Sequence, residues 1–242
     1  MFLFYKILIN LAFLFSPIII IIRLLKKKEH PIRFKEKLGF YTKKKIDGKL
    51  IWFHGASVGE ILSIVPLLEK LEKNKEIKQI LVTSNTLSSS KVLSNLKLKK
   101  TVHQFFPIDT NYHTQKFLDY WKPSSVFFID SEIWPNMITN VKKKSIPLIL
   151  INARITKKSF RKWKIFFLDA KKIFKKFDLC LTSNFKSLKY LNLLGAKKIK
   201  FIGNLKFSES EKDANVLNKD LKKFFLSKKI WCASSTHDFE EK

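Results

Sequence analysis

The chain has 242 residues and a formal net charge of +28 at pH 7, so it is long enough for one large hydrophobic core or two modest ones. Lysine supplies almost all of this charge, and the resulting field favours anionic partners such as a phospholipid surface. Arginine is scarce and no recognised nucleic-acid-binding motif is present, which argues against a nucleic-acid partner. The two cysteines, Cys180 and Cys232, are far apart in the sequence, which argues against a disulfide or a zinc site.

An apolar segment opens the chain. Residues 2–22 are almost entirely apolar, and in a helix they would span roughly 30 Å, the thickness of a bilayer core. A basic flank follows at 23–28 without a small-residue cleavage signature, which predicts a retained membrane anchor at residues 1–28. The positive-inside rule places the rest of the chain on the cytoplasmic side. Lys6 and Pro17 weaken a spanning helix, so a helix lying in the membrane interface is the alternative.

The next segment, residues 29–48, is short and basic and is interrupted by Pro31 and Gly39. It is interpreted as a juxtamembrane linker that touches anionic headgroups. A solvated linker is the alternative.

From residue 49 to 207, apolar strand-like stretches alternate with helix-like ones. The strand-like stretches are 50–53, 79–83, 102–106, 125–129, 147–151, 179–182 and 199–202. Strands that are apolar throughout and are separated by helices predict an α/β domain with a Rossmann-like parallel sheet covered by helices. Residues 208–242 are more polar and end with a strand-like stretch at 229–233, which is interpreted as the start of a second domain.

The stretch from Ile51 to Glu60 carries the first candidate site. A short apolar strand runs into a loop of small residues, and Glu60 lies in the first turn of the helix that follows. Open α/β sheets bind their ligands at such strand ends. The partial positive charge of the helix terminus predicts a low pKa for Glu60, which would keep this carboxylate ionised. The spacing of Ser57 and Glu60 also fits a capping box, in which the acid only completes the helix.

Four stretches together show a resemblance to a known family. They are His54-Gly-Ala-Ser-Val-Gly-Glu60, Asp130-Ser-Glu-Ile-Trp-Pro-Asn136, Asn152-Ala-Arg154 and Gly203-Asn-Leu-Lys-Phe207. In this order they resemble the amino-terminal half of 3-deoxy-D-manno-octulosonic acid (Kdo) transferase, and residues 233–237 match further along. The resemblance implies a two-domain GT-B glycosyltransferase, with 49–207 as the acceptor-side domain and 208–242 as an interdomain segment and truncated start of the CMP-sugar domain.

The resemblance also implies roles for single residues. Glu60 would be the general base that deprotonates the acceptor hydroxyl, Glu132 would stabilise the transition state, and Lys206 would offset negative charge on the departing phosphate. Asp130 stands where the family usually has Glu. In an extended chain the side chains of Asp130 and Glu132 would leave the same face and could hold Mg²⁺, but the family is not known to need a metal, so no metal or cofactor is expected.

The remaining candidates are expected to bind substrate. Ser57 and Gly59 lie in the first loop, where glycine lets backbone and ligand approach closely. Asn136 ends the second motif. Arg154 follows a strand and could clamp a phosphate of the acceptor lipid, although an ordinary strand-end arginine is the alternative.

The leading hypothesis is an inverting glycosyltransferase that moves Kdo from CMP-Kdo to lipid IVA, the lipid A precursor, in lipopolysaccharide biosynthesis. It would be anchored at the cytoplasmic face of the bacterial inner membrane. A non-catalytic lipid-binding fragment is the alternative, because the expected donor domain is missing. A membrane-attached nucleic-acid binder would rest on charge alone. The chain has no Gly-x-Gly-x-x-Gly stretch, which argues against a dinucleotide enzyme.

Overall fold

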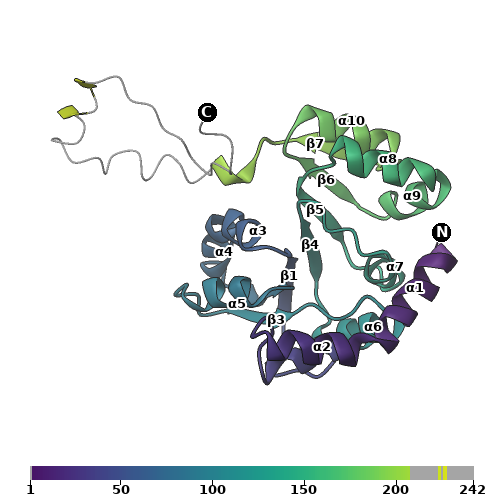
Figure 1. The fold of residues 1–242 in the computed structure, drawn as a ribbon. Helices are drawn as coiled ribbons and strands as arrows, with labels where there is room; N and C mark the ends of the chain where they lie inside the picture. The colour runs from purple at the N-terminus through teal and green to yellow at the C-terminus, as the bar shows by residue number, and fades with distance from the viewer. Residues whose placement is uncertain (1, 208–222, 225, 228–242) are drawn as a thin grey trace. The chain divides into compact units, whose positions relative to one another are not determined.

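A parallel sheet forms the centre of the computed structural model, which describes residues 2–207, 223–224 and 226–227. Within these residues seven strands lie side by side in the order β3-β2-β1-β4-β5-β6-β7, all parallel (Figure 1). The strands are β1 Lys49–His54, β2 Ile77–Ser84, β3 Thr101–Phe105, β4 Ser125–Ile129, β5 Leu148–Ala153, β6 Leu179–Thr182 and β7 Ile199–Phe201. The predicted Rossmann-like α/β fold is confirmed.

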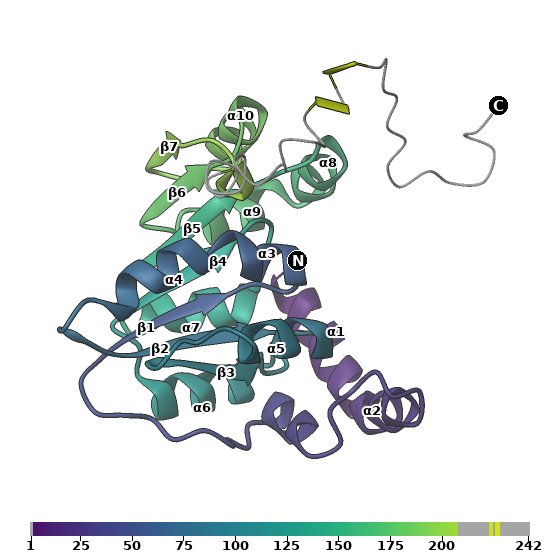
Figure 2. The same cartoon turned by 90° about the vertical axis from the view of Figure 1, so that its left-hand side faces the viewer.

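Burial on both faces explains why the strands are apolar throughout. In β1 every residue after Lys49 is buried, because helices cover the sheet on both sides. One face packs on α3, α4 and α5, and the other on α6, α7, α9 and α10 (Figures 1 and 2). These helices are α3 Val58–Ser63, α4 Val65–Glu72, α5 Leu87–Ser94, α6 Asn111–Trp121, α7 Pro135–Lys143, α9 Phe167–Phe174 and α10 Phe185–Leu193, and α8 Lys157–Ile165 precedes α9.

The chain divides into two compact units, Met1–Lys206 and Phe207–Lys242. The expected strand at 229–233 and the family-like stretch at 233–237 lie outside the described residues. The expected domain limits at residues 28, 48 and 207 stay predictions.

The helix expected to begin near Glu60 is divided in two. It breaks at Ile64, between α3 and α4, because Pro66 has no N–H to donate to the preceding turn and its ring disfavours a continuous helix there. Proline is well suited to the first turn of α4 for the same reason.

The apolar segment at the amino terminus is also divided, so the prediction of one continuous helix over 2–22 is wrong. It forms α1 Phe2–Leu14 and α2 Ser16–Leu25, which are bent by 51° where Pro17 enters the first turn of α2. No single described helix has the length and apolar character to cross a membrane; the bent pair meets that test together, on length and composition only.

One face of the two amino-terminal helices docks on the domain beside α6 (Figure 1). The Tyr5 hydroxyl donates to Asp109 Oδ2 at 2.7 Å, and the ring of Phe13 lies 4.8 Å from that of His113. The opposite face exposes apolar side chains, namely Phe4, Ile7, Leu8, Leu11, Leu14, Phe15, Ile18, Ile19, Ile21, Ile22 and Leu25.

The segment expected to be a linker packs against the domain. The 3₁₀ helix η1, Arg33–Leu38, contains Glu36, whose side chain is fully buried. Glu36 accepts bonds from the Arg33 guanidinium at 2.8 and 3.2 Å and from the Phe105 amide of β3 at 2.7 Å. Because η1 satisfies polar groups at the sheet edge, this part of residues 29–48 is not a solvated linker.

Candidate active site

The strand order places the predicted catalytic residues at one end of the sheet. The chain reverses its direction of strand addition between β1 and β4, and in such sheets the carboxyl ends at the reversal form the ligand crevice. Glu60 follows β1, Glu132 follows β4, Arg154 follows β5 and Lys206 follows β7. Since all the strands are parallel, these four residues belong to the same end of the sheet.

The first turn of α3 holds the Glu60 carboxylate by both of its oxygens. The Ser57 hydroxyl donates to Oε1 at 2.8 Å, and the Ala56 amide donates to Oε2 at 2.8 Å. Ser57 Oγ also caps the helix by accepting the Glu60 amide at 3.3 Å. The Ser57 half of the predicted capping box is therefore present, while the Glu60 carboxylate accepts from the Ala56 amide and the Ser57 hydroxyl, and these bonds fix the position of the candidate base.

Gly55 makes room for this carboxylate. A Cβ atom at residue 55 would lie 3.1 Å from both Glu60 Cβ and Ile129 Cδ1. These contacts are tighter than side chains normally allow, so a larger residue at this strand end would push Glu60 out of place.

The pKa of Glu60 is raised, so the prediction of a low pKa is wrong. Burial is the main cause, and the negative charges of Glu132 and Asp130 add to it, whereas the bonds from Ser57 and Ala56 lower the pKa. Burial beside two other acids outweighs the favourable place of Glu60 in the first turn of α3. A raised pKa brings the carboxylate closer to the working range of a general base.

The Glu132 carboxylate is held by the side chains of His54 and Trp134. Its Oε2 lies 3.2 Å from His54 Nε2 and accepts the Trp134 indole N–H at 2.7 Å. Burial raises its pKa, but the hydrogen bond and charge of His54 and the bond from Trp134 outweigh burial, and the net shift is downward. Glu132 therefore stays ionised in the site.

The extended geometry expected for Asp130 to Glu132 is wrong. Asp130 adopts a left-handed conformation, with φ of 59°, and the chain turns there. The Asp130 carbonyl accepts the Arg154 amide at 3.3 Å, and the Ser131 hydroxyl donates to the Arg154 carbonyl at 2.9 Å. The turn joins the ends of β4 and β5, and the Arg154 side chain is exposed beside it.

Lys206 is placed by two asparagines that the sequence did not single out. Asn152 Oδ1 accepts the Leu205 amide at 3.1 Å, and Asn204 Oδ1 accepts the Lys206 amide at 3.1 Å. These bonds fix the 3₁₀ helix η2, Leu205–Phe207, and Lys206 Nζ lies 3.4 Å from where a Cβ would stand on Gly59. The ammonium group thus lies against the first turn of α3. Both asparagines fall inside the stretches that resemble the family, and this position was the sequence signal by which they could have been found.

Asn136 lies away from this cluster. It is buried, its side-chain amide donates to the Asp109 carbonyl at 2.5 Å, and its own backbone amide donates to Asp109 Oδ2 at 3.0 Å. The Met137 amide donates to Asp109 Oδ1 at 2.8 Å. Asn136 therefore helps Asp109 to cap α7, and its expected contact with substrate stays a prediction.

Two hollows among the described residues lie beside the amino-terminal helices. The first, of about 320 Å³, lies between the amino-terminal helices and the ends of β2 and β3; its lining includes Ile9, Arg23, Lys37, Phe106 and Trp134. The second, of about 380 Å³, lies between α1 and α8; its lining includes Tyr5, Ile133, Trp163 and Phe166. Trp134, which lines the first hollow, is also the residue that donates to Glu132.

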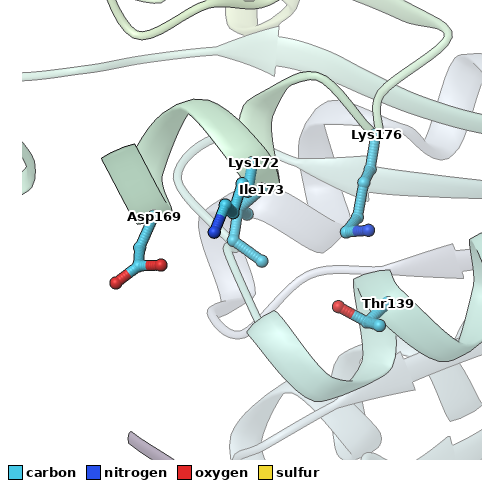
Figure 3. Close-up of a pocket in the computed structure, with 5 residues that line it drawn as sticks. All are labelled: Thr139, Asp169, Lys172, Ile173 and Lys176. Carbon is cyan, nitrogen blue, oxygen red and sulfur yellow. The ribbon is translucent and has the colours of Figure 1, made fainter. Parts of the chain in front are cut away.

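A smaller pocket, of about 230 Å³, lies between α7 and α9 (Figure 3). It is lined by Thr139, Asp169, Lys172, Ile173 and Lys176. None of the predicted site residues lines this pocket, so the sequence motifs and the pocket mark different places on the domain.

Comparison with known proteins identifies relatives of this chain. A family model described as 3-deoxy-D-manno-octulosonic-acid transferase (kdotransferase) matches residues 32–209. The 3-deoxy-D-manno-octulosonic acid transferase of Rickettsia bellii is 37% identical over 235 residues, which cover 96% of this chain and 56% of that protein. The probable mitochondrial 3-deoxy-D-manno-octulosonic acid transferase of Arabidopsis thaliana is 32% identical over 90% of this chain and 51% of that protein. The chain spans about half the length of the curated relatives it matches.

Solved structures share the fold. A UDP-N-acetylglucosamine 2-epimerase from Rickettsia bellii superposes with a TM-score of 0.51 and 14% identity, over 73% of this chain and 51% of the epimerase. The epimerase from Neisseria meningitidis gives a TM-score of 0.50 and 15% identity, over 73% of this chain and 52% of the epimerase. At this level of identity the likeness shows the fold alone.

Proposed function

The chain belongs to the Kdo transferase family, and from this premise we propose that the protein takes part in transferring Kdo from CMP-Kdo to lipid IVA in lipopolysaccharide biosynthesis. The observation that carries the proposal is the group of residues at the sheet reversal. Glu60 is fixed there as a partly buried carboxylate, and the Lys206 ammonium lies against the same helix turn.

In the proposed reaction, a hydroxyl oxygen of the acceptor forms a bond to the anomeric carbon of Kdo. The bond from that carbon to the CMP phosphate breaks, and CMP leaves with the electron pair. Glu60 takes the hydroxyl proton, which the raised pKa of its carboxyl group favours. Lys206 offsets the charge that develops on the departing phosphate. Attack from the face opposite the phosphate inverts the anomeric centre.

Membrane attachment is part of the same proposal. The outer face of α1 and α2 exposes many apolar side chains, and the inner face packs on the domain through Tyr5 and Phe13. A docked, bent pair of this kind suits binding in the plane of a membrane interface. The surrounding lysines add attraction to anionic headgroups, and we place the protein at the cytoplasmic face of the inner membrane.

Replacement of the candidate base tests the reaction. In an assay of labelled Kdo transfer to lipid IVA, Glu60→Gln should lower turnover by a factor on the order of 10² or more. Glu69→Gln makes the same chemical change on the exposed side of α4 and should leave turnover unchanged. Turnover of Glu60→Gln within a few-fold of the wild type would contradict the assignment. Lipid IVA binding without transfer by the wild-type chain would favour the lipid-binding alternative.

A further inference from the structure

The hollow of about 380 Å³ between α1 and α8 has no role in the proposed reaction. Three parts of the chain form its walls. Tyr5 lies on the α1 side, Ile133 and Pro135 come from the start of α7 and the loop before it, and α8 with the residue that follows it supplies the rest. Apolar and aromatic side chains dominate this lining, so the hollow suits an apolar ligand.

The α8 wall is one face of a helix that lies on the surface of the domain. Four residues at helical spacing line the hollow from this side, namely Ser159, Lys162, Trp163 and Phe166. Trp163 also packs edge-on against Phe174 of α9, with ring centroids 5.4 Å apart. No residue of α8 is buried, so the helix serves as an outer wall of the hollow and adds nothing to the main core.

Positive charge is concentrated on the same helix. Five residues of α8 are basic and none is acidic, and all five basic side chains are exposed: Lys157, Lys158, Arg161, Lys162 and Lys164. Only Lys162 among these five lines the hollow. A phosphate group at the mouth of the hollow would therefore meet positive charge on α8.

Apolar side chains are exposed on both sides of the hollow. Phe4 and Leu8 are exposed on α1, and Ile165 and Leu168 are 73% and 74% exposed where α8 meets α9. Exposed apolar side chains beside basic ones are typical of a protein surface that meets a membrane. A lipid held in that membrane would therefore find the hollow at the surface of the protein that faces it.

The hollow and one candidate catalytic residue share a loop. Ile133, in the wall of the hollow, directly follows Glu132 in the loop between β4 and α7. The next residue, Trp134, donates its indole N–H to Glu132 Oε2 at 2.7 Å. A ligand in the hollow would thus lie against the loop that carries Glu132.

We propose that the hollow between α1 and α8 binds one acyl chain of the phosphorylated lipid acceptor, with Lys162 facing a phosphate of its headgroup. The inference rests on the proposed function and adds to it the place where the acceptor is held. The apolar lining selects an acyl chain, and the basic helix selects an anionic headgroup. An anionic lipid carries both features in one molecule.

Filling the hollow tests the acyl site. Ser159→Trp places a large ring in the hollow, and Ser88→Trp makes the same change at an exposed position on α5. In equilibrium binding of labelled lipid IVA in detergent micelles, Ser159→Trp should weaken binding about tenfold, and Ser88→Trp should bind like the wild type. The lipid IVA headgroup without its acyl chains should bind equally to Ser159→Trp and to the wild type. Unchanged lipid IVA binding by Ser159→Trp, or an equal loss for the deacylated headgroup, would overturn the proposal.

Removal of one charge tests the place of the headgroup without adding bulk. Lys162→Gln should weaken lipid IVA binding several-fold, as expected for a lost contact with phosphate. Lys164→Gln makes the same change on the same helix outside the hollow and should have a smaller effect. Equal losses in the two variants would mean that α8 attracts the lipid only through its overall charge, which would overturn the assigned position.

Vesicles of phosphatidylglycerol without lipid IVA separate this site from general membrane contact. Ser159→Trp should bind these vesicles like the wild type, whereas an equal loss for vesicles and for lipid IVA would overturn the site. None of these measurements depends on transfer. A chain that binds lipid IVA through the hollow but transfers no Kdo would contradict the proposed reaction and support the acyl site. Kdo transfer together with normal lipid IVA binding by Ser159→Trp would do the reverse.

Discussion

Burial of Glu60 raises its pKa, which suits a general base but lowers the stability of the folded chain when the carboxyl group ionises. Its folded pKa is raised chiefly by burial, so between its unfolded and folded pKa values the folded chain binds more protons than the unfolded chain. Stability should therefore fall as pH rises through this interval, and Glu60→Gln should remove that loss. We expect the free energy of unfolding of Glu60→Gln, relative to the wild type, to increase from pH 4 to pH 7 in urea titrations. Glu69→Gln serves as the control, and a difference that shrinks with rising pH would contradict the expectation.

Asn152 offers a test of how Lys206 is positioned. Its φ of 51° is left-handed, so Asn152→Gly keeps the backbone conformation while it removes the buried side chain that accepts the Leu205 amide. We expect roughly a tenfold loss of kcat, equivalent to about 1.4 kcal/mol, as Lys206 loses its fixed place. Asn152→Asp retains an acceptor oxygen and should recover most of the activity. Equal activity of the glycine variant and the wild type would show that η2 needs no such anchor.

The sequence predicted the location of these side chains better than their electrostatic state. The capping of α3 could be read from Ser57 and Glu60 because their interaction is local. The raised pKa of Glu60 and the pairing of His54 with Glu132 depend on the contact of β1 with β4, and His54 and Glu132 are 78 positions apart. The left-handed turn at Asp130 was not predicted from the sequence either. Positive φ is rare in residues other than glycine, and only five such residues in the described part of the chain have it.

Among the secondary-structure elements, α1 depends on a specific polar contact for its docking. Tyr5→Phe removes the hydroxyl that donates to Asp109, and a lost hydrogen bond of this kind costs about 1 kcal/mol. Amide exchange in α1 should become roughly fivefold faster while the central strands keep their protection. Tyr112→Phe, on the exposed surface of α6, should leave exchange in α1 unchanged. Unaltered exchange in Tyr5→Phe would indicate that packing of Phe13 is sufficient.

The helix breaks and the linker differ in how far sequence could have revealed them. The breaks at Phe15 and Ile64 each lie two residues before a proline, Pro17 and Pro66, and could be inferred from local sterics. The packing of η1 could not, because Glu36 satisfies the Phe105 amide 69 positions away. A basic, proline-containing segment looks like a linker until that partner is known.

For the whole molecule, the exposed apolar face of α1 and α2 predicts membrane binding that resists salt. Salt screens the attraction of lysines to anionic lipid but not the burial of apolar side chains. In co-sedimentation with phosphatidylglycerol vesicles at about 0.5 M salt, where screening is strong, the wild type should stay bound. Leu14→Ser with Ile21→Ser should weaken binding about tenfold. Leu193→Ser, an exposed position on α10, is the control. A wild-type chain that stays unbound even at low salt would contradict the prediction.

The position of Lys206 against Gly59 also has a consequence during protein synthesis. Residue 206 lies 146 positions after residue 60 in the chain, and ribosomes add about 5–20 residues per second. Roughly 7–30 seconds therefore separate the synthesis of Glu60 from that of Lys206. Late in that interval β1 and β2 have both been synthesised and can pair, whereas the lysine that lies against the first turn of α3 in the finished fold is still absent. The site is thus among the last features of the first unit to be completed on the ribosome.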